Sequence, residues 1–250
     1  MKAKAALFAL WFPAAVLVLW QLGAALRWVD PLFFPPPTAI LATAGKMVSS
    51  GELLRHLGAT LARMGAGLLA GALPGALFGL LMGTIGWVRR STEPLVSALN
   101  STPKLALLPM LMLFFGVGET ARLLLVAAGC FLTMAIQTMD AVTSVNRAFI
   151  EMAVNYGADR WALWRKVYVP SALPQIFTGV RLSLGRALVI TISVELVSAQ
   201  NGLGSLIWSS WQTFTIAKLY VGVTVAATLG AILHWGSQRL EVRLIPWHEH

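Results

Sequence analysis

Six long apolar runs constrain the fold of this chain more than any other feature of its sequence. A transmembrane helix needs about 20 predominantly apolar residues in a row. Because lipid offers the backbone no hydrogen-bond partner, such runs cross a membrane as helices. The sequence therefore predicts an all-α membrane protein with six transmembrane helices. The runs are residues 5–26, 59–87, 94–116, 121–138, 174–197 and 217–235.

The charge and cysteine content agree with a membrane protein. Only 12% of the residues are charged, whereas soluble domains carry about 25%. The net charge of +9 reflects basic residues that we expect to hold loops on the cytoplasmic side, so no nucleic-acid partner is predicted. The single cysteine, Cys130, allows no disulfide within the chain and indicates no metal cluster.

The first apolar run follows Lys2 and Lys4. It is longer than the apolar region of a cleaved signal peptide, which has about 7–15 residues, so we expect a retained helix that enters from the cytoplasm. An external amphipathic segment is expected from Thr38 to Met47. These features divide the chain into an N-terminal helix with its external connection, a core of five transmembrane helices and a cytoplasmic tail. The three parts are residues 1–58, 59–240 and 241–250.

A stripe of glycines marks the second apolar run. A glycine occurs at every fourth position, and in lipid such a stripe lets the backbone of another helix approach closely. A generic packing face explains any single glycine, whereas the whole set predicts a helix at the centre of a bundle. The glycines are Gly67, Gly71, Gly75, Gly79 and Gly83.

The third run is interrupted by Asn100, Pro103 and Lys104. A proline inside a helix lacks the N–H donor and leaves the carbonyl one turn earlier without its partner. Polar groups at membrane depth are tolerated only beside protein or water. A broken or partly re-entrant helix is therefore expected here.

A polar-rich segment, residues 146–170, separates the fourth run from the fifth. It predicts two short helices joined at Gly157, because glycine readily adopts the left-handed conformation that ends a helix. Asn146 and Asp159 are the expected N-caps of the two helices. Pro170 is expected to end the second helix, since proline cannot continue the backbone hydrogen-bond ladder.

The same segment resembles the EAA loop of bacterial ABC importer permeases. The family pattern is E-A-A, three residues, G, nine residues and I-x-L-P, and Glu151, Gly157 and Pro170 stand at its typed positions. Met152 replaces the middle alanine of the pattern. In that family the loop inserts into a groove on the cytoplasmic ATPase. The residues that the resemblance assigns to ATPase coupling are Glu151, Met152, Ala153, Gly157, Ala158, Asp159, Trp161 and Pro170.

The stretch PLVSALNSTPKLALLPMLMLFFGVGE in the third run and the sequence NGLG at residues 201–204 are similar to the sulfonate, taurine and nitrate branch of these permeases. The resemblance implies a type I importer bundle, a homodimer of the permease, cytoplasmic ATP-binding subunits and an external substrate-binding protein. It also implies a bacterial inner membrane and its lipid. ATP and magnesium are expected in the partner ATPase, because this chain has no G-x-x-x-x-G-K-[ST] motif. We therefore expect neither a cofactor nor enzymatic activity in the chain itself.

The balance of basic residues predicts the orientation. With six spans and both termini in the cytoplasm, the inner segments hold more lysine and arginine than the outer ones, as the positive-inside rule requires. This orientation also places the EAA-like loop in the cytoplasm.

Three charged residues, Lys104, Arg186 and Glu195, lie deepest in the apolar runs. A charge at the centre of a bilayer costs about 2.5–3.5 kcal/mol on insertion scales, so these side chains are expected to face the bundle interior or water. The sequence leaves open whether they contact the solute or only other helices. The translocation path is predicted at Asn100, Lys104, Ser193 and Glu195.

The sequence thus predicts the permease subunit of an ATP-driven importer for a small anion such as a sulfonate, taurine or nitrate. Two alternatives remain open. One is an ion-coupled secondary transporter in which Glu195 carries the ion, and ATP-independent uptake would favour it. The other is a noncatalytic membrane assembly subunit whose glycine stripe only packs partners, and failure of the reconstituted complex to transport any solute would favour it.

Overall fold

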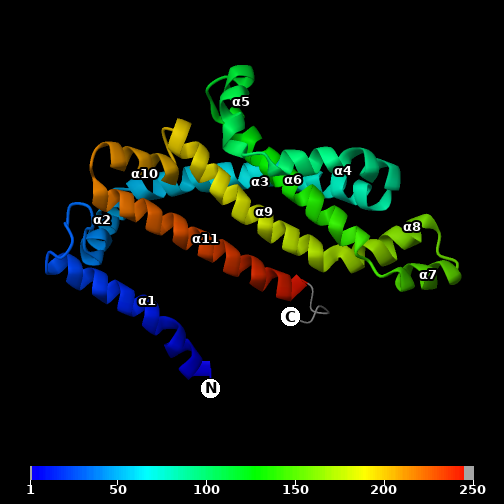
Figure 1. Cartoon of the computed structure of the whole chain (residues 1–250), viewed down its shortest axis with the longest axis horizontal. Coiled ribbons are helices and arrows are strands. Elements are labelled where there is room, and N and C mark those ends of the chain that lie inside the picture. The colour runs from blue at the N-terminus through cyan, green and yellow to red at the C-terminus, as the bar shows by residue number, and fades with distance from the viewer. Residues whose placement is uncertain (1, 245–250) are drawn as a thin grey trace. The chain divides into compact units, whose positions relative to one another are not determined.

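A computed structural model describes the backbone of residues 2–244 and the side chains from Trp11 to Leu244 (Figure 1). Over this part of the chain the structure contains helices and no strand, which confirms the predicted all-α class. The last residues of the predicted tail, 245–250, lie outside the described residues.

The helices follow one another with short connections. In chain order they are α1 (Lys2–Ala25), α2 (Pro37–Ser49), α3 (Glu52–Thr84), α4 (Gly86–Ser101), the 3-10 turn η1 (Lys104–Leu107), α5 (Leu108–Phe115), α6 (Glu119–Thr143), α7 (Arg147–Asn155), α8 (Arg160–Leu163), the π-turn η2 (Trp164–Tyr168), α9 (Val169–Ser198), α10 (Leu203–Gln212) and α11 (Ile216–Leu244).

By length and composition, the described residues contain fewer identifiable membrane spans than the six predicted. Among the described residues, α3, α6 and α11 are long and apolar enough to cross a membrane, and two bent helix pairs raise the count to at most five. The described part of α1, Trp11–Ala25, is a shorter apolar helix. The helical membrane architecture is therefore supported, whereas the six-span count stays a prediction.

The chain divides into two compact units. The first comprises Met1–Ala59 and Glu195–Ala227, and the second comprises Thr60–Val194 and Thr228–His250. In the first unit, the Lys218 ammonium lies 2.8 Å from the Glu52 carboxylate and ties α11 to the start of α3. The rings of Trp20 and Tyr220 lie 5.4 Å apart and join α1 to α11.

Helix α6 is the most enclosed helix of the second unit. In its most apolar window 56% of the residues are buried, against 28% in that of α3. Met82 of α3, Val96 of α4 and Met139 of α6 meet in one apolar cluster, and Leu125 of α6 packs with Val194 of α9 in another. The sequence predicted a central position for the glycine-rich helix, but within this unit the centre belongs to α6. The reason is that one face of α3 is exposed, where Leu69, Leu73 and Leu77 lie, whereas buried residues occur along the whole length of α6.

The third apolar run forms a broken helix, as predicted. The segments Gly86–Ser101 and Lys104–Phe115 meet at an angle of 95°, so that α5 leaves the direction of α4 (Figure 1). Thr102 and Pro103 have extended backbone at the break, with ψ angles of 136° and 108°.

One sequence expectation about a helix end is wrong. Pro170 does not end a helix, because it is the second residue of α9, which continues to Ser198. Proline is tolerated in a first turn, where its missing N–H is not needed. The π-turn η2 precedes it, and there the Val169 N–H bonds to the Trp164 carbonyl. Helix α10 begins within the NGLG sequence, at Leu203.

Candidate functional site

The polar-rich segment, residues 146–170, folds locally as its sequence predicts. The Asn146 side chain accepts a hydrogen bond from the Ala148 N–H at 2.9 Å and caps α7. Gly157 follows with a φ of +80°. The Asp159 carboxylate accepts from the Ala162 N–H at 2.7 Å and caps α8. We call residues 146–170 the α7–α8 segment from here on.

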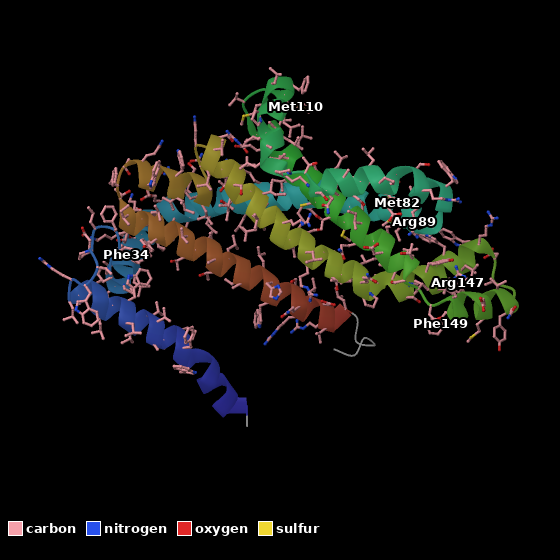
Figure 2. All side chains as sticks on the ribbon, viewed as in Figure 1. Phe34, Met82, Arg89, Met110, Arg147 and Phe149 are labelled. Atoms are coloured by element: carbon pink, nitrogen blue, oxygen red, sulfur yellow. The ribbon has the colours of Figure 1, made fainter. Side chains whose placement is uncertain are left out.

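The α7–α8 segment exposes large apolar side chains. It projects beyond the ends of α6 and α9, to which it is joined (Figure 1). Tyr156 is 87% exposed and Trp161 is 64% exposed. Phe149, labelled on α7 in Figure 2, is also exposed, and Met152 and Val154 share this property. Several large apolar side chains exposed on one short projecting segment indicate a site for another protein.

A hollow of about 510 Å³ opens between α7 and α8. Four of the residues predicted for ATPase coupling line it together: Ala153, Gly157, Ala158 and Asp159. Glu151 and Met152 are exposed on α7, and Trp161 stacks on Trp164 with 5.5 Å between ring centroids. Pro170 is absent from the lining, because it lies in α9.

The glycine stripe of α3 lies against α6. A Cβ atom added to Gly75 would stand 2.6 Å from the Phe131 carbonyl oxygen, and at Gly71 and Gly79 it would collide with other carbonyls of α6. At Gly67 and Gly83 it would meet the side chains of α6 valines. Real Cβ atoms essentially never approach other atoms under 3.0 Å. The absence of side chains along this stripe is therefore what permits the observed distance between α3 and α6.

The opposite face of α3 is apolar and exposed. It presents leucines at the same spacing of four residues, offset by two from the glycines. Because a leucine face of this kind is as apolar as lipid tails, it suits contact with lipid or with another apolar helix. These leucines are Leu69, Leu73, Leu77 and Leu81.

Lys104 donates hydrogen bonds to backbone carbonyls at the break in the third apolar run. Its ammonium group donates hydrogen bonds to the carbonyls of Leu99 at 2.8 Å, Asn100 at 2.7 Å and Thr102 at 2.8 Å. The Leu99 carbonyl is the one that Pro103 leaves without its helical donor. A cation is also favoured at a helix C-terminus, where unpaired carbonyls point outward. The Lys104 side chain thus caps the C-terminal end of α4.

Residues 75–245 match the family model described as "Binding-protein-dependent transport system inner membrane component". The chain belongs to this family. The match covers the glycine stripe from Gly75 onward, the break at Lys104, the α7–α8 segment and α9 to α11. The chain is therefore an ABC importer permease subunit and a multi-pass protein of the inner membrane.

Curated relatives align with the permease over nearly all of its length. The taurine transport system permease protein TauC of Escherichia coli (strain K12) is 34% identical, covering 94% of this chain and 87% of that protein. The putative aliphatic sulfonates transport permease protein SsuC of the same strain is 33% identical, covering 95% and 91%. The riboflavin transport system permease protein RibX of Chloroflexus aurantiacus (strain ATCC 29366 / DSM 635 / J-10-fl) is 37% identical, covering 93% and 87%. All three are transport permeases, so the chain is a noncatalytic transport subunit, and neither alternative from the sequence is favoured.

Solved structures support the fold. A chain of the inward-facing MetNI methionine ABC transporter superposes with a TM-score of 0.68 at 20% identity, covering 76% of this chain and 94% of that one. A chain of an amino acid ABC transporter superposes with a TM-score of 0.62 at 18% identity, covering 81% and 97%. The permease thus has the type I importer fold.

The other residues predicted for the translocation path lie in different surroundings. Asn100, at the end of α4, accepts a hydrogen bond from the Arg186 guanidinium at 2.7 Å through its side-chain oxygen. Ser193 is half-buried on α9, and its hydroxyl bonds to the Val189 carbonyl of the same helix.

Glu195 is only 1% exposed, and its carboxylate accepts from the Gly204 N–H at 3.1 Å. This contact holds the NGLG turn at the start of α10.

The sequence missed the contact between Arg186 and Asn100, which are separated by 86 positions. Only the polar character of both residues at membrane depth signalled it. The sequence also missed the bond between the buried His56 ring and the Gly202 carbonyl, at 2.9 Å within the first unit. No pattern around His56 could have found that partner.

The capping contacts of Lys104 predict a stability effect rather than a transport effect. Replacing Lys104 by methionine should lower the unfolding free energy by about 1–2 kcal/mol, because carbonyls at the end of α4 lose their donor. The apparent KM for uptake should change less than about twofold, since the ammonium points to the backbone. Thermal unfolding in detergent and initial uptake rates measure the two quantities. A KM raised tenfold at unchanged stability would instead place Lys104 in contact with the solute.

Proposed function

We propose that two copies of this permease form the transmembrane path of an ATP-driven importer for a small anion such as a sulfonate, taurine or nitrate. Each copy contributes six spans with both termini in the cytoplasm. An external binding protein delivers the solute, and ATP-binding subunits dock from the cytoplasm. ATP and magnesium bind in those partner subunits.

The exposed α7–α8 segment carries this proposal. It joins α6 to α9, so a partner that moves it acts directly on two long helices. Its N-caps and the left-handed Gly157 shape a hollow whose lining combines small residues, such as Ala153 and Ala158, with the exposed Tyr156. Aromatic side chains that fill pockets supply most of the binding energy in protein interfaces. These features suit insertion into a groove of an ATPase.

The substrate class rests on the relatives and on the charges of the path. TauC and SsuC are named for the transport of taurine and of aliphatic sulfonates, and both kinds of solute carry a sulfonate group. RibX is named for riboflavin transport, so the family membership alone does not select the solute. Arg186 contacts Asn100 at the break of the third run and forms no ion pair within the described residues, so its positive charge favours the anion.

The proposal predicts that the α7–α8 segment binds the ATPase. Replacing both Tyr156 and Trp161 by alanine should weaken binding of the ATP-binding subunits at least tenfold, because each loses an exposed aromatic contact. Co-purification from membranes and ATP-driven uptake of taurine into proteoliposomes measure the effect. Trp28→Ala is the matched control, since Trp28 is equally exposed in the other unit. Undiminished co-purification of the double variant would refute docking at this segment.

A further inference from the structure

One face of α9 carries exposed side chains and a single charged residue, Arg186. Positions 182, 186, 189 and 193 fall on this face, because they are spaced by four, three and four residues along a helix. Leu182 is 45% exposed, Val189 is 65% exposed, and Arg186 between them is also exposed. Arg186 is the eighteenth of the 30 residues of α9, so it lies near the middle of a helix of membrane length. We call this the Arg186 face.

The positive charge of Arg186 is not neutralised within the described residues. Within the described residues, its guanidinium donates to the neutral amide oxygen of Asn100 at 2.7 Å. The ion pairs found in the described part of the chain join other arginines and lysines to carboxylates, and none includes Arg186. Arg181, on the same helix, contrasts with it, because it pairs with the buried Glu241 at 3.1 Å. Arg186 therefore retains its full charge and most of its N–H donors.

A guanidinium that has no carboxylate partner and lies near the middle of a membrane-spanning helix cannot face lipid tails. Charged side chains within membrane spans face water or protein, because their desolvation in hydrocarbon is costly. The Asn100 contact orients the guanidinium beside the break between α4 and η1. The Lys104 ammonium group brings a second positive charge to the same break, since it donates a hydrogen bond to the backbone carbonyl of Asn100. The N–H donors of Lys104 are bonded to backbone carbonyls, whereas most N–H donors of Arg186 have no hydrogen-bond partner within the described residues.

We propose that Arg186 is a solute-contacting residue of the water-filled path and selects anions that carry a planar or tetrahedral oxyanion group, such as sulfonates. The inference rests on the proposed import function and names the residue that sets its substrate class. A guanidinium presents several N–H donors in a rigid fork that matches oxyanions, and such charge-assisted bonds are about twice as strong as neutral ones. Asn100 is a positioning residue, because it holds the fork toward the path.

The test measures the local charge of the path with thiol reagents, independently of which solute is transported. Val189→Cys places a thiol one turn from Arg186 on the same face. The complex of the permease with its ATPase subunits in proteoliposomes is treated with a sulfonatoethyl or a trimethylammonioethyl methanethiosulfonate reagent. The wild-type chain, whose only cysteine is the buried Cys130, is the blank.

The sulfonate reagent should modify Val189→Cys about tenfold faster than the cationic one, because a nearby positive charge attracts the first and repels the second. Adding Arg186→Gln should abolish this preference, whereas Arg186→Lys should retain most of it. Adding Arg239→Gln, which removes an exposed cation of α11, should leave the ratio unchanged. Taurine uptake by Arg186→Gln alone should show a raised KM with ATP hydrolysis intact.

Two results would overturn the inference. If neither reagent modifies Val189→Cys, in nucleotide-free or in nucleotide-trapped complexes, the Arg186 face is packed against lipid or a second copy. If both reagents react but Arg186→Gln leaves their ratio unchanged, Arg186 does not set the charge of the path. Neither result bears on the import function itself, which ATP-driven uptake by the wild-type complex tests separately.

Discussion

Replacing Gly75 by leucine should prevent the permease from reaching its folded state. A Cβ atom at this position would lie 2.6 Å from the Phe131 carbonyl oxygen and 3.0 Å from the Phe131 Cα. Both atoms belong to the backbone of α6, so no side chain can rotate away to make room. Overpacking of a core costs typically about 1–3 kcal/mol, and a clash with backbone falls at or above the upper end. Even Gly75→Ala should be destabilising.

The yield of monodisperse protein in detergent and its unfolding temperature measure this effect. Gly65→Leu is the matched control on the same helix, because a Cβ atom there meets nothing within 4 Å. Gly75→Leu should yield little folded protein, whereas Gly65→Leu should behave like the wild type. Equal yields and equal unfolding temperatures for the two variants would show that α3 and α6 do not pack through the glycine stripe.

The sequence predicts those features whose cause is local. Asn146 and Asp159 are caps because a short polar side chain reaches the N–H groups two or three residues ahead. Gly157 adopts a positive φ because other residues do so at a cost. Pro103 breaks the third run because it lacks an N–H donor. Each of these inferences needs only a few neighbouring residues.

Features that depend on tertiary packing were predicted less well. The glycine stripe indicated a close helix neighbour, but its partner and the central place of α6 depend on which residues α6 presents, far along the chain. Pro170 was misjudged because the π-turn before it changes the local bonding, and no sequence pattern marks that turn. The sequence placed Arg186 at depth, yet its contact with Asn100 follows only from the packing of α9 beside the broken helix.

Replacing Gly157 by valine should uncouple ATP hydrolysis from transport. Gly157 has a φ of +80°, and a Cβ atom added to it would meet nothing within 4 Å. The cost of the substitution is therefore backbone strain alone, about 1–2 kcal/mol for an L-residue in the left-handed region and more for a β-branched one. The α7–α8 segment is exposed and lies at the end of the second unit, so it can relieve this strain by changing the angle between α7 and α8. Such a change displaces the hollow that Ala153 and Ala158 line.

The measurement is the ratio of taurine transported to ATP hydrolysed in proteoliposomes that contain the whole importer. Gly157→Val should lower this ratio at least tenfold, and Gly157→Asn should lower it less, because asparagine tolerates a positive φ. Gly51→Val is the matched control, since Gly51 has a φ of +75° and equally open surroundings in the connection before α3. It should lose comparable stability and keep the wild-type ratio. If both variants reduce the ratio alike, strain acts through general stability, and the geometry at Gly157 has no special part in coupling.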